Sequence, residues 1–586
     1  MEPSRELCDM ITSRYFPILY TNTMNEVDLL PHQISALYGS RVQLDGRISS
    51  GLVSESEDKL PRGILIADET GLGKTVIIGL YILYLKLGGL GRNVIIAAPK
   101  SITTQWKWEL LSKANLIFNV INTGKELKQI DKSRDLNIIV SIDLLKTENG
   151  MSFLESLKDE QIDVSVIDEA HHVLSYNETY RRKMSLKLRE KSKLLLLSTA
   201  TPFRGNNREK QIIKDLLGEN YVYIRRIKED VKDFQGRPLF EPRKSFLFSI
   251  NLTAYWDSIY KNLERKIDRL HTQNIVKLVL KKRLASSIYS FAISYEKVLS
   301  NKLLSEDEIL GETDDFRGKE MDANLFKEST NDLYMKELGI YNYTKDMLEP
   351  KEEWLLNNFQ QLLQKYGDKV VVFTEYVSTL KRLSSVLKSH RIEYAFVHGE
   401  MDTDERFHEI KKFRNNDKIK LLLATDVAGE GLNIQVANIQ INYDIPWSPL
   451  KLEQRFGRLH RYGQKRIVYL FNLYIESTLD QRIVEAVITK LDNIARRLGD
   501  WIFDYVGDLI SIEDIREILE NNNKDINLNQ EKLEEIKRSI ASPKDPNLHE
   551  IEQYVSKYKY RIDDKFNIHY VLSNIESIKK YCYDQS

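Results

Sequence analysis

The feature that most constrains this chain is a glycine-rich loop between a buried strand and an apolar helix. Residues 63–67 form an apolar run typical of a buried strand, and residues 75–87 are expected to form an apolar helix. Between them the loop ends in Gly71-Leu72-Gly73-Lys74-Thr75. Glycines let main-chain N–H groups converge on phosphate oxygens, and the helix N-terminus adds its positive dipole. The sequence therefore predicts a loop that binds the phosphates of a nucleoside triphosphate.

Two side chains at the end of this loop have the chemistry that such a site needs. Lys74 is expected to reach the β- and γ-phosphates, and the Thr75 hydroxyl is expected to bind Mg²⁺. One residue departs from the usual pattern. The general form G-x-x-x-x-G-K-[ST] would place glycine at position 68, where this chain has Asp68.

Length and charge set the frame for the rest of the chain. A chain of 586 residues is too long for a single core and suggests three or four domains. Its 86 basic and 86 acidic side chains give no net charge. Any surface for nucleic acid must therefore arise from local sorting of charge, because the whole molecule supplies no attractive field.

Cysteine usage and hydropathy indicate a cytoplasmic protein without a membrane partner. The two cysteines, Cys8 and Cys582, lie near opposite ends of the sequence and predict neither a disulfide framework nor a metal-ligand cluster. This usage favours a reducing compartment. The first residues contain no signal-peptide core, and the longest apolar run, residues 76–85, is too short to span a bilayer.

Residues 1–220 show the alternating strand and helix pattern of a parallel sheet. Buried strands are expected at 93–99, 137–140, 164–167 and 194–197. The third is followed by Asp168-Glu169-Ala170-His171-His172, at the end of a strand where open α/β sheets bind ligands. Asp168 is expected to hold Mg²⁺ through water, and Glu169 to orient or deprotonate the attacking water. The alternative is two acids that cap the start of a helix.

Two further features lie around this pattern. Gln33, upstream of the glycine-rich loop, has an amide that can donate and accept at once, as an adenine edge requires. A glutamine on a solvated helix face is the alternative. Small hydroxyl residues in Ser198-Thr199-Ala200-Thr201-Pro202 follow the last strand and could bond to the acidic residues.

A second α/β pattern begins near residue 352 and has no phosphate loop of its own. Strands are expected at 370–373, 396–399, 421–425 and 439–443. Beyond them, arginines at 455, 458 and 461 project from neighbouring faces of a helix. One interpretation is a solvated basic helix. The other makes Arg458 and Arg461 fingers that stabilise charge on the γ-phosphate bound to the first sheet.

The remaining segments are read as connectors and helices. A polar linker is expected from residue 221 to about 242, helices from 250 to 350 with an acidic loop at 300–334, and a charged helical tail without a motif beyond 500. The predicted domains are an ATP-binding lobe at 1–220, a linker with helical insertions at 221–350, a second lobe at 351–500 and a helical extension at 501–586.

Taken together, these motifs resemble those of the superfamily-two helicases and translocases. Within that group the pattern is similar to the SWI/SNF-related ATPases and to their bacterial RapA (HepA) branch. The residues that carry the resemblance are DETGLGKT (68–75), APKSITTQW (98–106), DEAHH (168–172), STATP (198–202), VFTEY (372–376), ATDVAGEGLN (424–433) and WSPLKLEQRFGRLHRYGQ (447–464). In this family an aspartate at position 68 is normal, and IRRIKED (224–230) looks like the connector after the first lobe.

The resemblance implies two RecA-like lobes that bind ATP and Mg²⁺, and it assigns roles to individual residues. ATP would be bound by Gln33, Thr70, Gly71, Leu72, Gly73, Lys74, Thr75 and Gly431. Magnesium would be held by Thr75 and Asp168, and the catalytic residues would be Lys74, Asp168, Glu169, Arg458 and Arg461. Contacts to the DNA backbone are expected from Lys100, Ser141, Thr374 and Thr425 or their immediate neighbours.

The activity implied is a DNA-dependent ATPase that moves along duplex DNA, generally without separating the strands. Its partners would be double-stranded DNA and RNA polymerase or other DNA-bound proteins. Three alternatives stay open at this stage: a strand-separating helicase, the motor subunit of a restriction or defence system, and a nucleic-acid-binding scaffold that has lost catalysis. The sequence leaves open the complex that is remodelled, the direction of travel and the oligomeric state.

Overall fold

The chain folds into two compact units in this computed structural model. The first contains residues 1–239, 507–509 and 527–586, and the second contains residues 240–506 and 510–526. The structure describes residues 5–24, 29–42, 48–50, 52–53, 61–174, 180–200, 207–226, 228, 231–241, 243–272, 274–299, 347–399, 401–426, 434–446, 449–476, 478, 481, 548–558 and 568–585.

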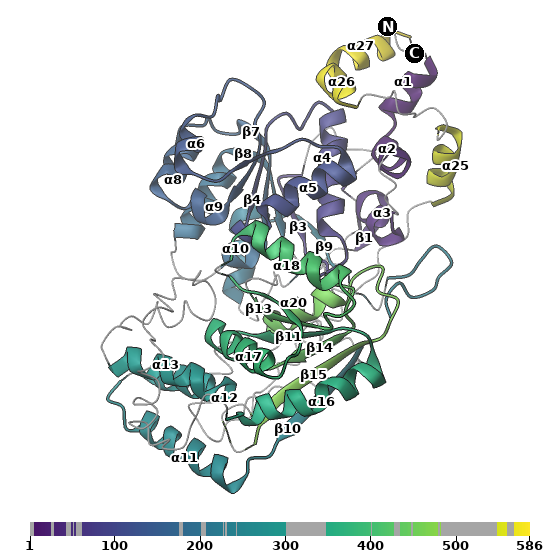
Figure 1. The fold of residues 1–586 in the computed structure, drawn as a ribbon. Helices are drawn as coiled ribbons and strands as arrows, with labels where there is room; N and C mark the ends of the chain where they lie inside the picture. Colours follow the sequence, from purple (N-terminus) through teal and green to yellow (C-terminus); the bar gives the residue numbers. More distant parts are fainter. Residues whose placement is uncertain are drawn as a thin grey trace. The chain divides into compact units, whose positions relative to one another are not determined.

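A seven-stranded sheet forms the centre of the first unit, and all its neighbouring strands are parallel (Figure 1). Sheets of this kind are buried on both faces, which explains why their strands read as continuous apolar runs. In spatial order the strands are β5 (Asn119–Ile121), β6 (Asn137–Ser141), β4 (Val94–Ala98), β7 (Ile162–Asp168), β8 (Ser192–Ser198), β3 (Gly63–Ile66) and β9 (Val222–Ile224).

Alternate side chains of each strand enter two different cores, one on each face of the sheet. In β3, for example, Ile64 and Ile66 enter one core and Leu65 enters the other. The first core includes side chains of α3 (Pro31–Tyr38), α4 (Lys74–Leu87) and α5 (Thr103–Ala114). The second includes side chains of α6 (Gly124–Lys128), α7 (Ile142–Leu145), α8 (Glu148–Glu155), α9 (Tyr180–Glu190) and α10 (Asn207–Leu217). The shorter elements are β1 (Ser40–Val42) and β2 (Ile48–Ser50), which pair antiparallel, and the 3-10 helices η1 (Lys100–Ile102) and η2 (Ala170–His172).

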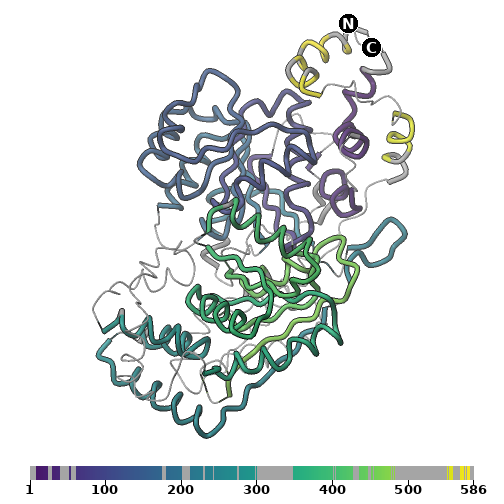
Figure 2. Tube along the Cα trace, in the orientation of Figure 1, coloured from purple at the N-terminus to yellow at the C-terminus, as the bar shows by residue number. Residues whose placement is uncertain are grey.

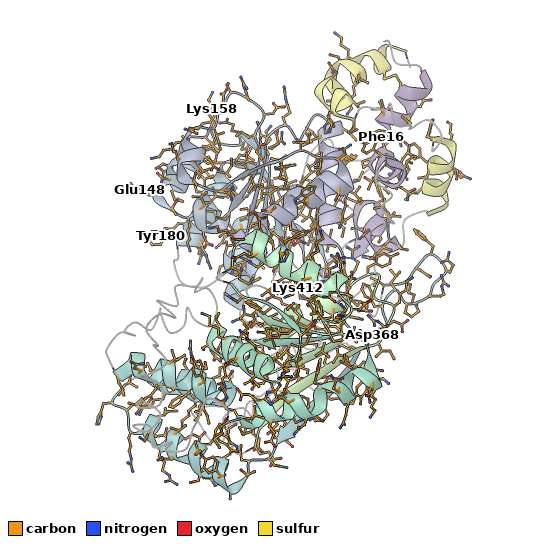
Figure 3. The ribbon with its side chains drawn as sticks, in the orientation of Figure 1. Phe16, Glu148, Lys158, Tyr180, Asp368 and Lys412 are labelled. Atoms are coloured by element: carbon orange, nitrogen blue, oxygen red, sulfur yellow. A yellow bond between two sulfur atoms is a disulfide. The ribbon has the colours of Figure 1, made fainter. Side chains whose placement is uncertain are left out.

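Helices from both ends of the sequence lie side by side in the first unit (Figure 2). The N-terminal helices are α1 (Arg5–Thr12) and α2 (Phe16–Met24), and the C-terminal helices are α25 (Leu548–Tyr558), α26 (Ile568–Ser573) and α27 (Ile575–Gln585). Helix α27 contacts α1, and α25 contacts α2. Phe16, labelled in Figure 3, is fully buried, and the Tyr554 hydroxyl donates a hydrogen bond to the Met10 carbonyl at 2.7 Å.

This packing joins the two cysteines. Cys8 and Cys582 form a disulfide with Cα atoms 5.4 Å apart, although 574 positions separate them in the sequence. The prediction that these two cysteines make no disulfide is therefore wrong. Their distance along the chain gave no hint of the pairing, because it depends on the return of the C-terminal helices to α1.

The second unit is built on a six-stranded sheet that is also entirely parallel. Its strands are, in spatial order, β10 (Arg243–Ile250), β15 (Val468–Ile475), β14 (Ile439–Asn442), β11 (Val370–Thr374), β13 (Leu421–Thr425) and β12 (Tyr394–Val397). Strand β10 was not predicted, because the expected linker ended near residue 242 and the expected helices began at 250. Its alternate side chains Phe246, Phe248 and Ile250 pack on the core while Leu247 is exposed, the period of an edge strand.

Helices cover both faces of the second sheet. One core contains side chains of α11 (Ala254–Asp268), α12 (Asn274–Ser286), α13 (Ile288–Leu299), α16 (Pro350–Tyr366) and α17 (Val377–Ser389). The opposite core contains side chains of α18 (Thr403–Asn415) and α20 (Pro449–Leu459). The helices expected after residue 250 thus belong to the second unit, and the predicted acidic loop at 300–334 lies outside the described residues. Nowhere in the described part of the chain is a helix long and apolar enough to cross a bilayer.

Candidate active site

The glycine-rich loop connects β3 to the first turn of α4, as the sequence predicts. Gly71 and Gly73 have φ angles of 95° and 81°, a region that favours glycine. A Cβ atom at Gly73 would also lie 2.4 Å from the side-chain nitrogen of Gln33. Glycine is favoured here by the backbone conformation, and any larger residue would also force the Gln33 amide to move.

Lys74 lies at the start of α4 and turns back toward the loop. Its Nζ donates a hydrogen bond to the Asp68 carbonyl at 2.8 Å and a longer one to the Glu69 carbonyl at 3.4 Å. Burial lowers the pKa of Lys74 below its ordinary value, while the carboxylates of Glu169 and Asp168 oppose this effect. The ammonium group therefore lies within electrostatic reach of the acidic residues that follow β7.

Asp168 ends β7 and is held by a tryptophan of α5. The Trp106 Nε1–H donates to Asp168 Oδ2 at 2.7 Å, and both side chains are buried. The strand register also places Ser198 of β8 opposite Asp168. Burial and the neighbouring Glu169 raise the pKa of Asp168 to about 6, and the Trp106 and Ser198 side chains oppose this rise. Trp106 is a site residue that the sequence analysis quoted within a motif without assigning it a role.

Glu169 follows directly in a left-handed backbone conformation, with a φ angle of 49°. A non-glycine residue in this region is uncommon and often marks a functional position. One of its carboxylate oxygens lies 3.3 Å from Nδ1 of the buried His171. The strand end thus directs two consecutive carboxylates into different surroundings.

Gln33 lies on α3 and is buried beside the glycine-rich loop. Its Nε2 donates to the Leu72 carbonyl at 3.4 Å, and its Oε1 accepts a bond from the Leu30 N–H at 3.1 Å. The ring of His32 also contacts the Leu72 carbonyl, at 2.9 Å. The alternative of a solvated helix face is therefore wrong. An adenine contact of Gln33 stays a prediction.

The donor set fits a magnesium ion bound together with a nucleotide. Mg²⁺ prefers oxygen ligands and is usually held by one or two carboxylates, a hydroxyl, water and substrate phosphates. Asp168 and the hydroxyl of Thr75 are the protein ligands expected at this site. Among the described residues no group of three or more His, Cys, Asp or Glu side chains forms a metal site, which leaves phosphate oxygens and water to complete such a coordination shell.

In the second unit, Arg455 is the centre of a buried polar network. Its guanidinium forms an ion pair with Asp426 and donates to the Asp444 carbonyl at 2.8 Å. Asp444 also accepts hydrogen bonds from the Thr374 hydroxyl and, at 2.8 Å, from the Ser286 hydroxyl of α12. This network connects the ends of β11, β13 and β14 with the helical block that precedes them.

The two predicted arginine fingers lie at the end of α20. Arg458 is in its last turn and is mostly buried, and Arg461 follows the helix with its Nε donating to the Gly457 carbonyl at 2.8 Å. Whether they reach a γ-phosphate stays a prediction. Gly431, expected to contact ATP, lies outside the described residues.

The four predicted DNA contacts lie at or just after the carboxyl ends of parallel strands, but their exposure differs. Lys100 is exposed in η1, directly after β4. Ser141, Thr374 and Thr425 are each less than 9% exposed, and the Ser141 hydroxyl accepts the Leu144 N–H at 3.1 Å as the cap of α7. A DNA contact in these three regions would therefore come from neighbouring main chain or side chains.

Comparisons with known proteins agree with these motifs. Residues 26–204 match the family model described as type III restriction enzyme, res subunit, and residues 351–463 match the helicase conserved C-terminal domain. The chain is 26% identical over 472 residues to the uncharacterized ATP-dependent helicase YqhH of Bacillus subtilis, covering 76% of this chain and 77% of that protein. It is also 26% identical over 498 residues to the RNA polymerase-associated protein RapA of Yersinia pestis, covering 79% of this chain and 49% of that protein.

A solved structure with similar coverage is the helicase domain of Hef from Pyrococcus furiosus, with 18% identity, a TM-score of 0.44, and coverage of 72% of this chain and 94% of that one. The chain spans about half the length of the RapA proteins it matches. The two parallel-sheet lobes each carry one of the two matched family models. The chain is therefore similar to the superfamily-two helicases, with relatives in their SWI/SNF-related group.

Proposed function

We propose that this protein is a DNA-dependent ATPase that translocates along double-stranded DNA and remodels or displaces protein–DNA complexes. The observation that carries the proposal is that the phosphate loop with Lys74 follows β3 and the carboxylates Asp168 and Glu169 come at the end of β7, so that they lie at the same edge of one parallel sheet. A sheet edge with a phosphate loop and two acids is suited to the hydrolysis of a nucleoside triphosphate.

Each residue has a distinct task in this proposal. The N–H groups of the loop and the Lys74 ammonium neutralise charge on the β- and γ-phosphates. Glu169 orients and deprotonates the attacking water. Arg458 and Arg461 stabilise the charge that develops on the γ-phosphate. Magnesium, held through Thr75 and Asp168, would supply further charge neutralisation at the phosphates.

The proposed DNA contacts lie on loops at the carboxyl ends of the strands in both units, with the exposed Lys100 as the side chain most available for a phosphate. Contacts of this kind position a duplex without reading its sequence. Stimulation by DNA is then expected to fall steeply with salt concentration, because neutralised phosphates release counterions. We further propose a cytoplasmic location and, from the similarity to RapA, RNA polymerase or another DNA-bound protein as partner.

The first experiment is steady-state ATP hydrolysis without nucleic acid and with single-stranded DNA, blunt duplex DNA or duplex RNA, using Lys74→Ala as the inactive control. Strong stimulation by blunt duplex DNA supports a translocase and leads next to triplex displacement. If only single strands stimulate hydrolysis, the proposal of duplex translocation is wrong. An inactive chain under all conditions would favour a scaffold.

Two alternatives have specific support. The relative YqhH is named an ATP-dependent helicase, and product formation on a forked duplex would favour strand separation. The match of residues 26–204 to a restriction-enzyme subunit favours a motor in a defence system, and co-purification with a nuclease or methyltransferase would support that assignment.

A further inference from the structure

The residue that breaks the usual phosphate-loop pattern has a buried partner far away in the sequence. Asp68 is completely buried, and both of its carboxylate oxygens bind the guanidinium of Arg226. Arg226 Nε donates to Oδ1 at 3.0 Å, and Arg226 NH2 donates to Oδ2. Buried charges are tolerated when they are paired and hydrogen-bonded, and a two-pronged arginine–carboxylate pair satisfies both conditions. The pair joins the loop to the segment after β9.

Arg226 holds more than the aspartate. Its NH1 donates to the main-chain carbonyl of His32, the residue before Gln33 on α3. Its own carbonyl accepts the N–H of Glu69 at 3.0 Å. One arginine therefore fixes the phosphate loop and the helix that carries Gln33 relative to each other.

A second tie lies two residues further along the same segment. Lys228 Nζ is 2.8 Å from Glu69 Oε1, and the Lys228 N–H donates to Glu69 Oε2 at 2.7 Å. Both side chains are less than 9% exposed. The two acidic residues of the loop, Asp68 and Glu69, are thus each bound by a basic residue of the segment 226–228.

The side chains of Asp68 and Glu69 that these ion pairs hold belong to the residues whose carbonyls bind Lys74. The Lys74 ammonium donates to the carbonyls of Asp68 and Glu69, the two residues whose side chains are held. A shift of this main chain would move the hydrogen-bond acceptors of Lys74 and the N–H groups that follow. Substrate-positioning contacts of this kind alter binding when they are displaced by about 1 Å.

We infer that Arg226 and Lys228 are positioning residues of the nucleotide site, which set the affinity for nucleotide by holding the phosphate loop: Arg226 ties it to α3, and both residues tie it to the segment after β9. The inference rests on the proposed ATPase function. Arg226 and Lys228 shortly precede residue 240, which is one of the points where the chain passes from the first unit into the second.

The test compares Arg226→Lys with a matched control on the same segment. Lysine keeps the charge but loses the planar fork that binds Asp68 at two points and reaches His32. The control is Arg237→Lys, because Arg237 also forms an ion pair with an aspartate, Asp233, at 2.7 Å, but on an exposed turn. We expect Arg226→Lys to raise the Kd for ADP and the KM for ATP at least tenfold, and the control to leave both within twofold.

Direct binding of fluorescent ADP separates this inference from the proposed function. Wild-type protein that binds no nucleotide would overturn both. Wild-type binding together with unchanged Kd and KM in Arg226→Lys would overturn the inference alone. A lower unfolding temperature without a change in Kd would also overturn it, since that is the result expected of a purely structural pair.

A second set of variants applies if Arg226→Lys does not fold. Glu69→Gln leaves the Asp68–Arg226 pair in place and loosens the Lys228 tie, and we expect it to raise the Kd for ADP severalfold. The double variant Lys228→Gln with Glu69→Gln should then raise the Kd no more than the worse single variant, because both act through one contact. Unchanged binding in Glu69→Gln, or effects that multiply in the double variant, would contradict the inference.

Discussion

Two consecutive carboxylates at the end of β7 have surroundings that suit different tasks. Asp168 is fixed by the Trp106 indole and lies opposite Ser198, whereas Glu169 lies in a left-handed backbone conformation beside His171. Consecutive residues on a regular strand would point to opposite faces. The backbone of Glu169 breaks this alternation at the end of the strand.

Removing the charge of Glu169 should separate binding from hydrolysis. We expect Glu169→Gln to bind ATP normally and to hydrolyse it about 10²- to 10⁴-fold more slowly, because a general base typically contributes this much. ATP binding and single-turnover hydrolysis measure the two effects. Hydrolysis by Glu169→Gln at the wild-type rate would show that the base is another residue.

A substitution at Trp106 can remove a single hydrogen bond from the same site. Trp106→Phe keeps the ring on α5 but removes the N–H bond to Asp168, and a hydrogen bond to a charged group is worth about 1.5–3 kcal/mol. We expect kcat to fall roughly tenfold or more. The matched control is Trp108→Phe on the same helix, since Trp108 is 65% exposed. Equal kcat values for the two variants would contradict a role for the indole.

The residues that could be predicted from the sequence are those that depend on local pattern. Lys74 and Asp168 each directly follow a recognisable strand or loop, so their neighbourhood identified them. The partner of Asp68 could not be found in this way, because Arg226 is 158 positions away and an Arg–Asp pair leaves no periodic signal. Trp106 was missed for a similar reason, since an indole on the buried face of an amphipathic helix looks like a core residue.

At the scale of single elements, α20 contributes arginines to two different surroundings. Arg455 in its middle is buried in ion pairs with Asp426 and Asp444, while Arg461 lies just beyond its end. Of the arginines at 455, 458 and 461, Arg455 therefore forms ion pairs within the second unit. The interpretation as a solvated basic helix is wrong for Arg455, which is 2% exposed.

The arginine that follows α20 is predicted to affect the rate of ATP hydrolysis. We expect Arg461→Ala to bind nucleotide as the wild type does and to lower kcat on the order of 10³-fold or more, the effect of losing an arginine finger. The control is Arg414→Ala at the exposed end of α18. A kcat close to the wild-type value in Arg461→Ala would exclude the finger role for this residue.

Two buried carboxylates, Glu349 and Glu352, lie at the start of helix α16, and Glu352 is paired with Arg382. Glu352 accepts two hydrogen bonds from Arg382, at 2.8 and 3.0 Å, and its Oε2 accepts the N–H of Glu349. Burial and the charge of Glu349 raise the pKa of Glu352 from 4.5 to about 7, although Arg382 opposes the rise. The folded protein therefore binds more protons than the unfolded chain between these two pH values.

Stability of the second unit should consequently fall as the pH rises from about 4.5 to 7. The expected change from this group is on the order of 2–3 kcal/mol. Denaturant unfolding across this range measures it, and Glu352→Gln should reduce the slope. The neighbouring Glu353→Gln, exposed on the same helix, is the control. A slope that is the same in both variants would show that Glu352 does not carry this pH dependence.

One strand of the second sheet could not be predicted from its own sequence segment alone. Strands β11, β13 and β14 are fully buried and were predicted, the first two as apolar runs, whereas β10 is an edge strand with a mixed face. Its pairing with β15 joins residues more than 200 positions apart. Only the packing of Phe246 and Phe248 against Phe471 makes that assignment clear.

On the scale of the whole molecule, the disulfide closes the chain on itself. We expect the protein purified without reductant to contain no free thiol, because Cys8 and Cys582 are its only cysteines. Thiol titration under denaturing conditions measures this directly. Cys8→Ser should lower the unfolding temperature only in the absence of reductant. Two free thiols in the purified protein would show that the bond does not form in the cell that made it.

The bridge also determines how the molecule would respond to mechanical load. The loop that Cys8 and Cys582 close contains both sheets. Tension applied to the two ends of the oxidised chain would pass through the covalent bond and leave both sheets unloaded. In the reduced chain the same tension would first peel α1 away from α27, so an optical-tweezer trace would report the redox state of the protein.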